Sequence, residues 1–319
     1  MKKLFYFLFL FIFLNLAAKA QQDPQFSFNK ETQLLVNPGF AGSNDALTGL
    51  ILNRYQWSGH EGTPQTLLFS VETTANIFGR SSGVGLNIIS DQLGFAKNVL
   101  VNLNYSYHIP TSIGELGIGT SLGLYYVSMN GEWETHVDGS FEPGSGEGDF
   151  LIPKGEVSQA TPDVGLGVYL KSTNYFASLS VTHLNQGEIT YNETEKEASY
   201  PLLRNYYLAG GYNISLANPL FELQPAIFAK TDLSSAQVDL TLNVVYNERF
   251  TGGLSYRIQD AVALLVGVEL LNGLNVGLAY DITTSAMGRN GYGSQEIYLR
   301  YTLGLGKGRM KKYKSIRFL

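Results

Sequence analysis

The feature that most constrains this chain is an alternation of apolar and polar residues that recurs in long runs. From Val99 to His108 the sequence reads VLVNLNYSYH, with valine, leucine and tyrosine at the odd positions and mostly asparagine, serine and histidine at the even ones. Similar runs cover 237–247, 274–282 and 296–305. Successive side chains of a β-strand point to opposite faces of a sheet, so a period of two over such lengths predicts strands.

Turn signals between these runs divide the chain into fourteen predicted strands. Every link from an even-numbered to an odd-numbered strand is short, whereas the three longest links, 130–161, 187–203 and 285–293, all run from an odd-numbered to an even-numbered strand. In an up-and-down meander the long links therefore share one rim, as in bacterial outer-membrane barrels. The predicted strands cover 46–58, 64–74, 82–92, 97–109, 114–129, 162–172, 174–185, 204–216, 221–232, 236–247, 250–259, 261–271, 274–284 and 294–305.

Two architectures can use such strands. A soluble sandwich buries the apolar faces of two sheets against each other and has strands of about 5–6 residues, whereas a membrane barrel turns the apolar face to lipid and has strands of about 9–11 residues. The predicted lengths favour an all-β, transmembrane, antiparallel barrel, which must close because lipid leaves backbone groups without other partners. We therefore expect Leu103 and Leu299 to face hydrocarbon, and Asn104 and Arg300 to face the lumen.

Residues 1–20 have the pattern of a secretory signal peptide. Lys2 and Lys3 precede an apolar run, and Ala18-Lys19-Ala20 forms a small-x-small cleavage site. The run is shorter than the ~20 residues that span a bilayer as a helix. We expect export, cleavage after Ala20 and insertion into the outer membrane.

The segment 21–45 precedes the first predicted strand and is not low in apolar residues. Asn37-Pro38-Gly39 interrupts any strand within it. We expect it to pack in the barrel lumen or at its periplasmic mouth and to occlude the barrel. The predicted organisation is thus a signal peptide at 1–20, a plug or strap at 21–45, a barrel at 46–305 and a tail at 306–319.

The predicted tail is strongly basic and has no acidic residue. The part of the chain between the signal peptide and the tail contains thirteen basic residues and all 27 acidic residues of the chain. A disordered solubilising end is the simpler interpretation of this asymmetry, and the functional alternative is docking of the tail on an acidic periplasmic partner or a cell-wall polymer. Export argues against nucleic acid as a partner. The basic residues of the tail are Lys307, Arg309, Lys311, Lys312, Lys314 and Arg317.

No catalytic or cofactor site is predicted. The chain has no cysteine, which excludes disulfides and thiolate metal sites. None of its four histidines has a metal-ligand spacing, and we expect His108 to make a hydrogen bond in the lumen. The loop 138–149 is rich in carboxylates and glycine but has no EF-hand spacing, so calcium binding there stays open.

Glycine pairs recur inside the predicted strands rather than in front of a helix. They argue against a nucleotide site and indicate bends or a close approach of the lumen contents. The pairs are Gly83 and Gly85, Gly117 and Gly119, and Gly165 and Gly167.

Several short motifs are concentrated in the first third of the chain. They are QDPQF at 22–26, NPGFAGS at 37–43, RYQW at 54–57, GTP at 62–64 and SDQLG at 90–94. Together they resemble the PorP/SprF family of outer-membrane proteins of the Bacteroidota. The family pattern more often reads NPAYAGS, so Gly39 and Phe40 depart from it, and the later strands match in pattern only. The motif positions, expected to have mainly structural roles, are Asn37, Pro38, Gly42, Arg54, Gln56 and Trp57.

The resemblance implies a non-enzymatic barrel of the type IX secretion and gliding machinery. Some members belong to the core apparatus, with periplasmic ring, lipoprotein and peptidoglycan-associated partners. Others are paired with a large secreted protein, often an adhesin, that they help to export or hold on the surface. The sequence leaves both roles open.

Three other readings compete with this one. A FadL-like channel for small hydrophobic compounds would have a similar strand number. A soluble secreted sandwich would bury its apolar face. An outer-membrane hydrolase would need a Ser/His or paired-carboxylate site, which the sequence does not reveal.

Overall fold

The computed structural model describes residues 23–59, 62–131, 134–137, 140–143, 155–193, 196–271, 273–285 and 291–305. The predicted signal peptide, the basic tail from Lys307 to Arg317 and most of the acidic loop 138–149 lie outside these residues. Among the described residues, no helix combines the length and apolar character needed to cross a bilayer.

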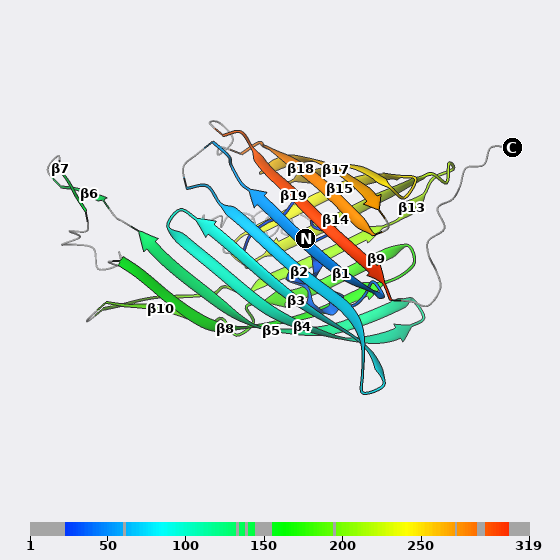
Figure 1. The fold of residues 1–319 in the computed structure, drawn as a ribbon, viewed down its shortest axis with the longest axis horizontal. Helices are drawn as coiled ribbons and strands as arrows, with labels where there is room; N and C mark the ends of the chain where they lie inside the picture. The colour runs from blue at the N-terminus through cyan, green and yellow to red at the C-terminus, as the bar shows by residue number, and fades with distance from the viewer. Residues whose placement is uncertain are drawn as a thin grey trace, which may run out of the picture.

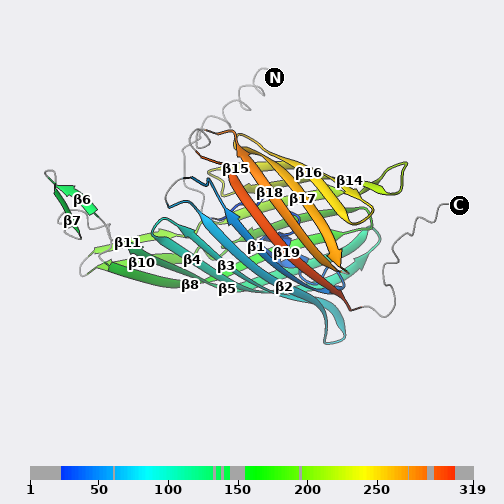
Figure 2. The same cartoon turned by 45° about the horizontal axis from the view of Figure 1, so that its top comes forward.

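Fourteen antiparallel strands form a closed barrel (Figures 1 and 2). Each strand pairs with its neighbour in the chain, and the first pairs with the last from Ala46 opposite Gly304 to Tyr55 opposite Gln295. The sheet therefore presents no open edge to lipid. The strands are β1 (Ala46–Tyr55), β2 (Gln65–Ile77), β3 (Arg80–Leu93), β4 (Ala96–Thr111), β5 (Gly114–Gly131), β8 (Gly155–Lys171), β9 (Tyr175–Thr182), β12 (Asn205–Tyr212), β14 (Phe221–Thr231), β15 (Ala236–Tyr246), β16 (Phe250–Arg257), β17 (Ala261–Leu271), β18 (Leu274–Thr283) and β19 (Ser294–Gly304).

Shorter elements complete the described chain. A helical turn α2 (Gln33–Val36) and a 3-10 turn η1 (Pro38–Phe40) precede the barrel. Two hairpins, β6 (Glu134–Val137) with β7 (Ser140–Pro143) and β10 (Glu188–Glu193) with β11 (Lys196–Pro201), belong to the two longest links. The two-residue strand β13 (Ile214–Ser215) pairs with the start of β14.

The predicted strand number and order are confirmed. The largest error is the start of β8, which lies at Gly155 rather than at 162. Strand β5 continues to Gly131 and pairs with β8 as far as Gly155, so the ribbon of two strands extends beyond the other strands. The residues 155–161 have few apolar side chains, and their extended form comes from this pairing rather than from alternation.

The long and short connections lie at opposite ends of the barrel, as the meander predicts. Figure 1 shows β6, β7 and β10 at one end and the tight turn between β2 and β3 at the other. We call these ends the long-loop rim and the short-turn rim.

The side chains follow an inside-out pattern. On β4, Leu103 is 64% exposed whereas Asn104 is 5% exposed, and on β19 Leu299 is 45% exposed. Arg300 points inward and pairs with Glu31. The predicted facing is thus confirmed, and it fits a barrel whose outer solvent is hydrocarbon.

Leu242, near the middle of β15 and 46% exposed, tests this facing. We expect Leu242→Lys to cost roughly 2–4 kcal/mol of the free energy of unfolding, because it places an ammonium group at the bilayer midplane. The matched control is Thr241→Lys, since Thr241 lines the interior cavity. Equilibrium unfolding in lipid vesicles measures both, and an equal loss in the two variants would contradict the assigned facing.

Candidate functional site within the barrel

Residues 23–45, here called the N-terminal segment, lie against inward-facing side chains of the barrel from one rim to the other. Asp23 contacts His183, just beyond β9 at the long-loop rim. At the other end, Lys171 at the end of β8 donates to the carbonyl of Ser43, and Ala46 begins β1 at the short-turn rim. The segment therefore runs along the barrel interior with its amino end near the long loops.

At its amino end, the segment is held by a buried charge cluster. His183 lies between two carboxyl groups, with Nε2 2.8 Å from Asp23 Oδ1 and Nδ1 2.8 Å from Asp163 Oδ1. Lys230 Nζ donates to the Asp23 carbonyl at 2.7 Å, and the Tyr207 hydroxyl donates to Asp23 Oδ2 at 2.5 Å. Both the backbone carbonyl and the side chain of Asp23 are therefore bound to the barrel wall.

The electrostatics of this cluster favour its charged form. Burial opposes a charge on His183, but the carboxylates of Asp23 and Asp163 outweigh burial and raise its pKa to about 10. Burial also opposes the Asp23 carboxylate, yet the cations of His183 and Lys230 hold the pKa of Asp23 well below its usual range. At neutral pH the cluster is thus a set of ion pairs rather than neutral hydrogen bonds.

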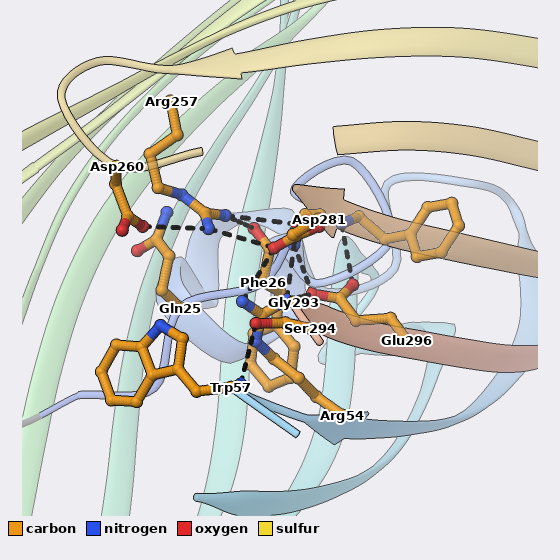
Figure 3. A network of polar contacts seen from close by, with 12 residues as sticks. Gln25, Phe26, Arg54, Trp57, Arg257, Asp260, Asp281, Gly293, Ser294 and Glu296 are labelled. Carbon is orange, nitrogen blue, oxygen red and sulfur yellow. Dashed lines mark hydrogen bonds and ion pairs between the residues drawn. The ribbon is translucent and has the colours of Figure 1, made fainter. Parts of the chain in front are cut away.

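A second network lies inside the barrel along the wall formed by β15 to β19 and β1, toward the long-loop ends of these strands (Figure 3). Arg54 of β1 donates through Nη2 to Asp281 Oδ2 of β18 at 2.9 Å, and through Nη1 to Glu296 of β19. Arg257 of β16 reaches the same Asp281 oxygen at 3.2 Å and also pairs with Asp239 of β15. All five side chains are at least 95% buried, so each charge depends on its partners.

The N-terminal segment completes this network. The Ser27 amide donates to Glu296 Oε1 at 2.6 Å, and the Ser27 hydroxyl donates to Asp281 Oδ1 at 2.7 Å. The side-chain amides of Gln25 and Asn29 donate to Asp239 Oδ2 at 3.1 and 2.9 Å. The carboxyl groups of three strands are therefore satisfied jointly by arginines of the wall and by the segment.

The carboxyl end of the segment rests on strand glycines. Asn37 Nδ2 donates to the Val168 carbonyl at 3.0 Å and to Ser178 Oγ at 2.7 Å, while its Oδ1 accepts from the Gly39 amide at 2.8 Å. A β-carbon on Gly83 would overlap the carbonyl of Ala41, and one on Gly119 would overlap Pro38. The predicted close approach to strand glycines is confirmed here.

The turn that leads into the barrel also needs a glycine. Gly42 has a φ of +70°, and a β-carbon there would overlap Gly83. Its amide donates to Glu72 Oε2 of β2 at 2.9 Å. Backbone strain and close packing both explain this motif position.

The structure brings four of the predicted motif residues, Asn37, Pro38, Gly42 and Arg54, into the contacts between segment and wall. Gln56 and Trp57 instead lie at the long-loop rim, where they line a cavity of about 250 Å³. His108 Nε2 donates to the Ala41 carbonyl at 2.9 Å, in line with the expected hydrogen bond.

Sequence reasoning missed the acidic partners and His183. Asp163, Asp239, Asp281 and Glu296 occupy inward positions of their strands, where a charged residue has to be paired. That combination of charge and inward position was the available signal. Among the described residues, no group of three or more histidine, aspartate or glutamate side chains could hold a metal.

A second, larger cavity of about 650 Å³ lies toward the short-turn rim. It is lined by residues of the segment, including Lys30 and Glu31, and by wall residues such as Glu222, Lys171 and Arg300. The contacts of Ser27 and Arg54 with Glu296 and Asp281 lie between this cavity and the rim pocket beside Trp57.

A closed fourteen-stranded barrel with apolar outer faces and a charged, polar interior is an outer-membrane β-barrel. The sequence from 18 to 301 matches the model of the type IX secretion system membrane proteins PorP/SprF, and the chain belongs to this family. Family and fold are those of outer-membrane barrels and transport components. No match was found among curated proteins.

Solved structures with a similar fold include two channel proteins. The Ralstonia pickettii toluene transporter TbuX is 10% identical with a TM-score of 0.50, over 85% of this chain and 93% of that one. The CymD monoaromatic hydrocarbon channel is 11% identical with a TM-score of 0.52, over 87% of this chain and 94% of that one. At such identity the similarity is one of fold.

Arg54→Gln tests the ion-pair network that joins Arg54 to Asp281 and Glu296. Removing the guanidinium leaves Asp281 and Glu296 buried with one cation fewer, so we expect a loss of about 3–5 kcal/mol in the free energy of unfolding. Arg249→Gln is the control, because Arg249 is exposed and its side chain donates to a carbonyl, that of Glu269, rather than to a buried carboxylate. Urea unfolding in vesicles measures the free energy of unfolding of both variants. A loss below about 1 kcal/mol for Arg54→Gln, similar to that of a surface substitution, would contradict a structural role for these ion pairs.

Proposed function

We propose that this protein is a non-enzymatic outer-membrane scaffold of the type IX secretion system, which supports secretion or surface attachment of a partner protein such as an adhesin. The observation that carries this proposal is the N-terminal segment bound along the barrel interior by two buried charge networks. A barrel with such contents is built to hold proteins in position rather than to pass solutes.

The segment occludes the lumen in this proposal. Its support is the number of independent anchors along the barrel axis: Asp23 on His183, Ser27 on Glu296, and Asn37 on Ser178. Displacing the segment would expose buried carboxyl groups of several strands without their partners, which is costly in a low-dielectric interior.

The orientation in the membrane follows from the unequal loops. With the long-loop rim outward, the partner would meet the hairpins β6–β7 and β10–β11 and the rim around Trp57. The short-turn rim would face the periplasm, and the basic tail from Lys307 to Arg317 would leave β19 there. The tail would then dock on secretion-system or peptidoglycan-associated components.

The fold similarity to TbuX and CymD favours one alternative, a channel for small hydrophobic compounds. That function requires a path past the N-terminal segment. Opening such a path would break the hydrogen bonds of Ser27 to Glu296 and Asp281, which argues against this alternative.

Deletion of the gene distinguishes the two functions. We expect the deletion to remove one or a few proteins from the cell surface and to leave the uptake of toluene unchanged. Expression of the full chain in the deletion strain should restore secretion and the surface proteins. Quantitative proteomics of the surface and the medium measures the first effect, and uptake of labelled toluene measures the second. Unchanged surface proteins together with reduced uptake would contradict the scaffold and support the channel.

A further inference from the structure

The cavity at the long-loop rim is not explained by the contacts that hold the N-terminal segment. Its volume is about 250 Å³, several times the ~30 Å³ that one water molecule occupies in the liquid. One wall is formed by Gln25 of the segment and by Gln56 and Trp57 after β1. The facing wall comes from the turns after β14 and β16, with Asp232 and Asp260. With Asn205 of β12, five parts of the chain that are distant in sequence therefore meet around one cavity.

Trp57 is presented to this cavity by a constrained backbone. Its φ of +51° lies in the left-handed region, which a bulky residue rarely adopts. The conformation is held by the Trp57 amide, which donates to Ser294 Oγ at 3.1 Å, and by the Ser58 amide, which donates to the Gly293 carbonyl at 2.8 Å. Figure 3 shows the indole on the side of Gln25 and Asp260. A strained and anchored aromatic residue at a cavity is a feature of binding sites.

The cations that line the cavity are already bound to the interior. Lys230 donates to the carbonyl of Asp23, and Arg257 is engaged by Asp239 and Asp281. The carboxyl group of Asp232 keeps acceptor capacity, because the hydrogen bonds from Ser234 and Ser235 all use Oδ1. Asp260 has long contacts, with Oδ2 3.5 Å from Arg257 Nη1 and Oδ1 3.4 Å from the Ser285 hydroxyl.

Acidic groups outnumber basic ones in the connected networks beneath this rim. Four cations, Arg54, His183, Lys230 and Arg257, face seven carboxyl groups, which are Asp23, Asp163, Asp232, Asp239, Asp260, Asp281 and Glu296. A site with an excess of acidic groups attracts a cation, and an aromatic face next to carboxylates is suited to a guanidinium or ammonium group.

We propose that this cavity binds a cationic side chain, arginine or lysine, of the exported partner. The cation lies over the indole of Trp57, and the carboxylates of Asp232 and Asp260 balance its charge. A buried basic anchor of this kind concentrates binding energy at one point of an interface. The inference rests on the proposed function for the identity of the partner, but cation binding itself is a property of the isolated barrel.

Tryptophan fluorescence tests the cavity directly. The chain has two tryptophans, so Trp133→Phe leaves Trp57 as the only one. The probe is the tripeptide acetyl-Gly-Arg-Gly-amide, and its control is the same peptide with neutral citrulline in place of arginine. We expect a saturable change in Trp57 emission with the arginine peptide, and binding at least roughly tenfold weaker for citrulline and for the double variant Asp232→Asn, Asp260→Asn.

Asp45→Asn is the matched control, since Asp45 lies next to the short-turn rim, and it is expected to leave peptide binding unchanged. Asparagine at position 232 keeps the acceptor for the Ser234 and Ser235 amides, and asparagine at position 260 keeps the acceptor for the Ser285 hydroxyl. Heat-modified mobility on gels shows whether each variant forms the barrel. An equal response to the arginine and citrulline peptides, or full binding by the double variant, would overturn the proposal.

The same variants in cells separate this inference from the proposed function. We expect the double variant to release the surface partner into the medium, whereas Asp45→Asn retains it. Retention of the partner by a double variant that no longer binds the arginine peptide would overturn the assignment of the partner to this cavity. Failure of the scaffold function would show differently, as unchanged surface proteins when the whole gene is deleted.

Discussion

Charged groups inside a membrane barrel have to be paired, and this constraint organises the interior of the protein. Asp239 of β15, Asp281 of β18 and Glu296 of β19 project inward from one side of the barrel and are buried from water. Two arginines of the wall neutralise part of this charge, and Ser27, Gln25 and Asn29 of the N-terminal segment supply the remaining hydrogen bonds. The segment is therefore part of the polar interior and not merely a peptide that lies in a pore.

The outer surface of the barrel is apolar, in contrast to the charged and polar interior. Leucines and tyrosines that would form the core of a soluble protein face outward, and the barrel gains its stability from a closed ladder of hydrogen bonds and from the polar contacts within. In the half of the barrel near the short-turn rim, the interior is closely packed. There, glycines of β3 and β5 let the backbone at Pro38 and Ala41 approach the sheet.

Alternation such as that of Leu103 and Asn104 predicted the strands and their facing, because successive side chains of a strand point to opposite sides of the sheet. Turn signals between the alternating runs predicted the number of strands. The start of β8 was missed, since residues 155–161 are extended by pairing with β5 and not by their own pattern. Arg54 was found through a motif, but its partners Asp281 and Glu296 are more than 220 positions away in the sequence. Only closure of the barrel brings β1 beside β19, so such pairs depend on a topology that local patterns do not encode. His183 gave no local signal, because its role depends on Asp23 and Asp163 approaching from different elements.

The central claim is that buried ion pairs keep the N-terminal segment across the lumen. The most direct measurement is the ion conductance of the purified chain in planar lipid bilayers, beside the double variant Arg54→Gln, Arg257→Gln. The account predicts a closed baseline for the unaltered chain and frequent openings for the variant. A steady open-pore conductance of the unaltered chain, equal to that of the variant, would contradict it.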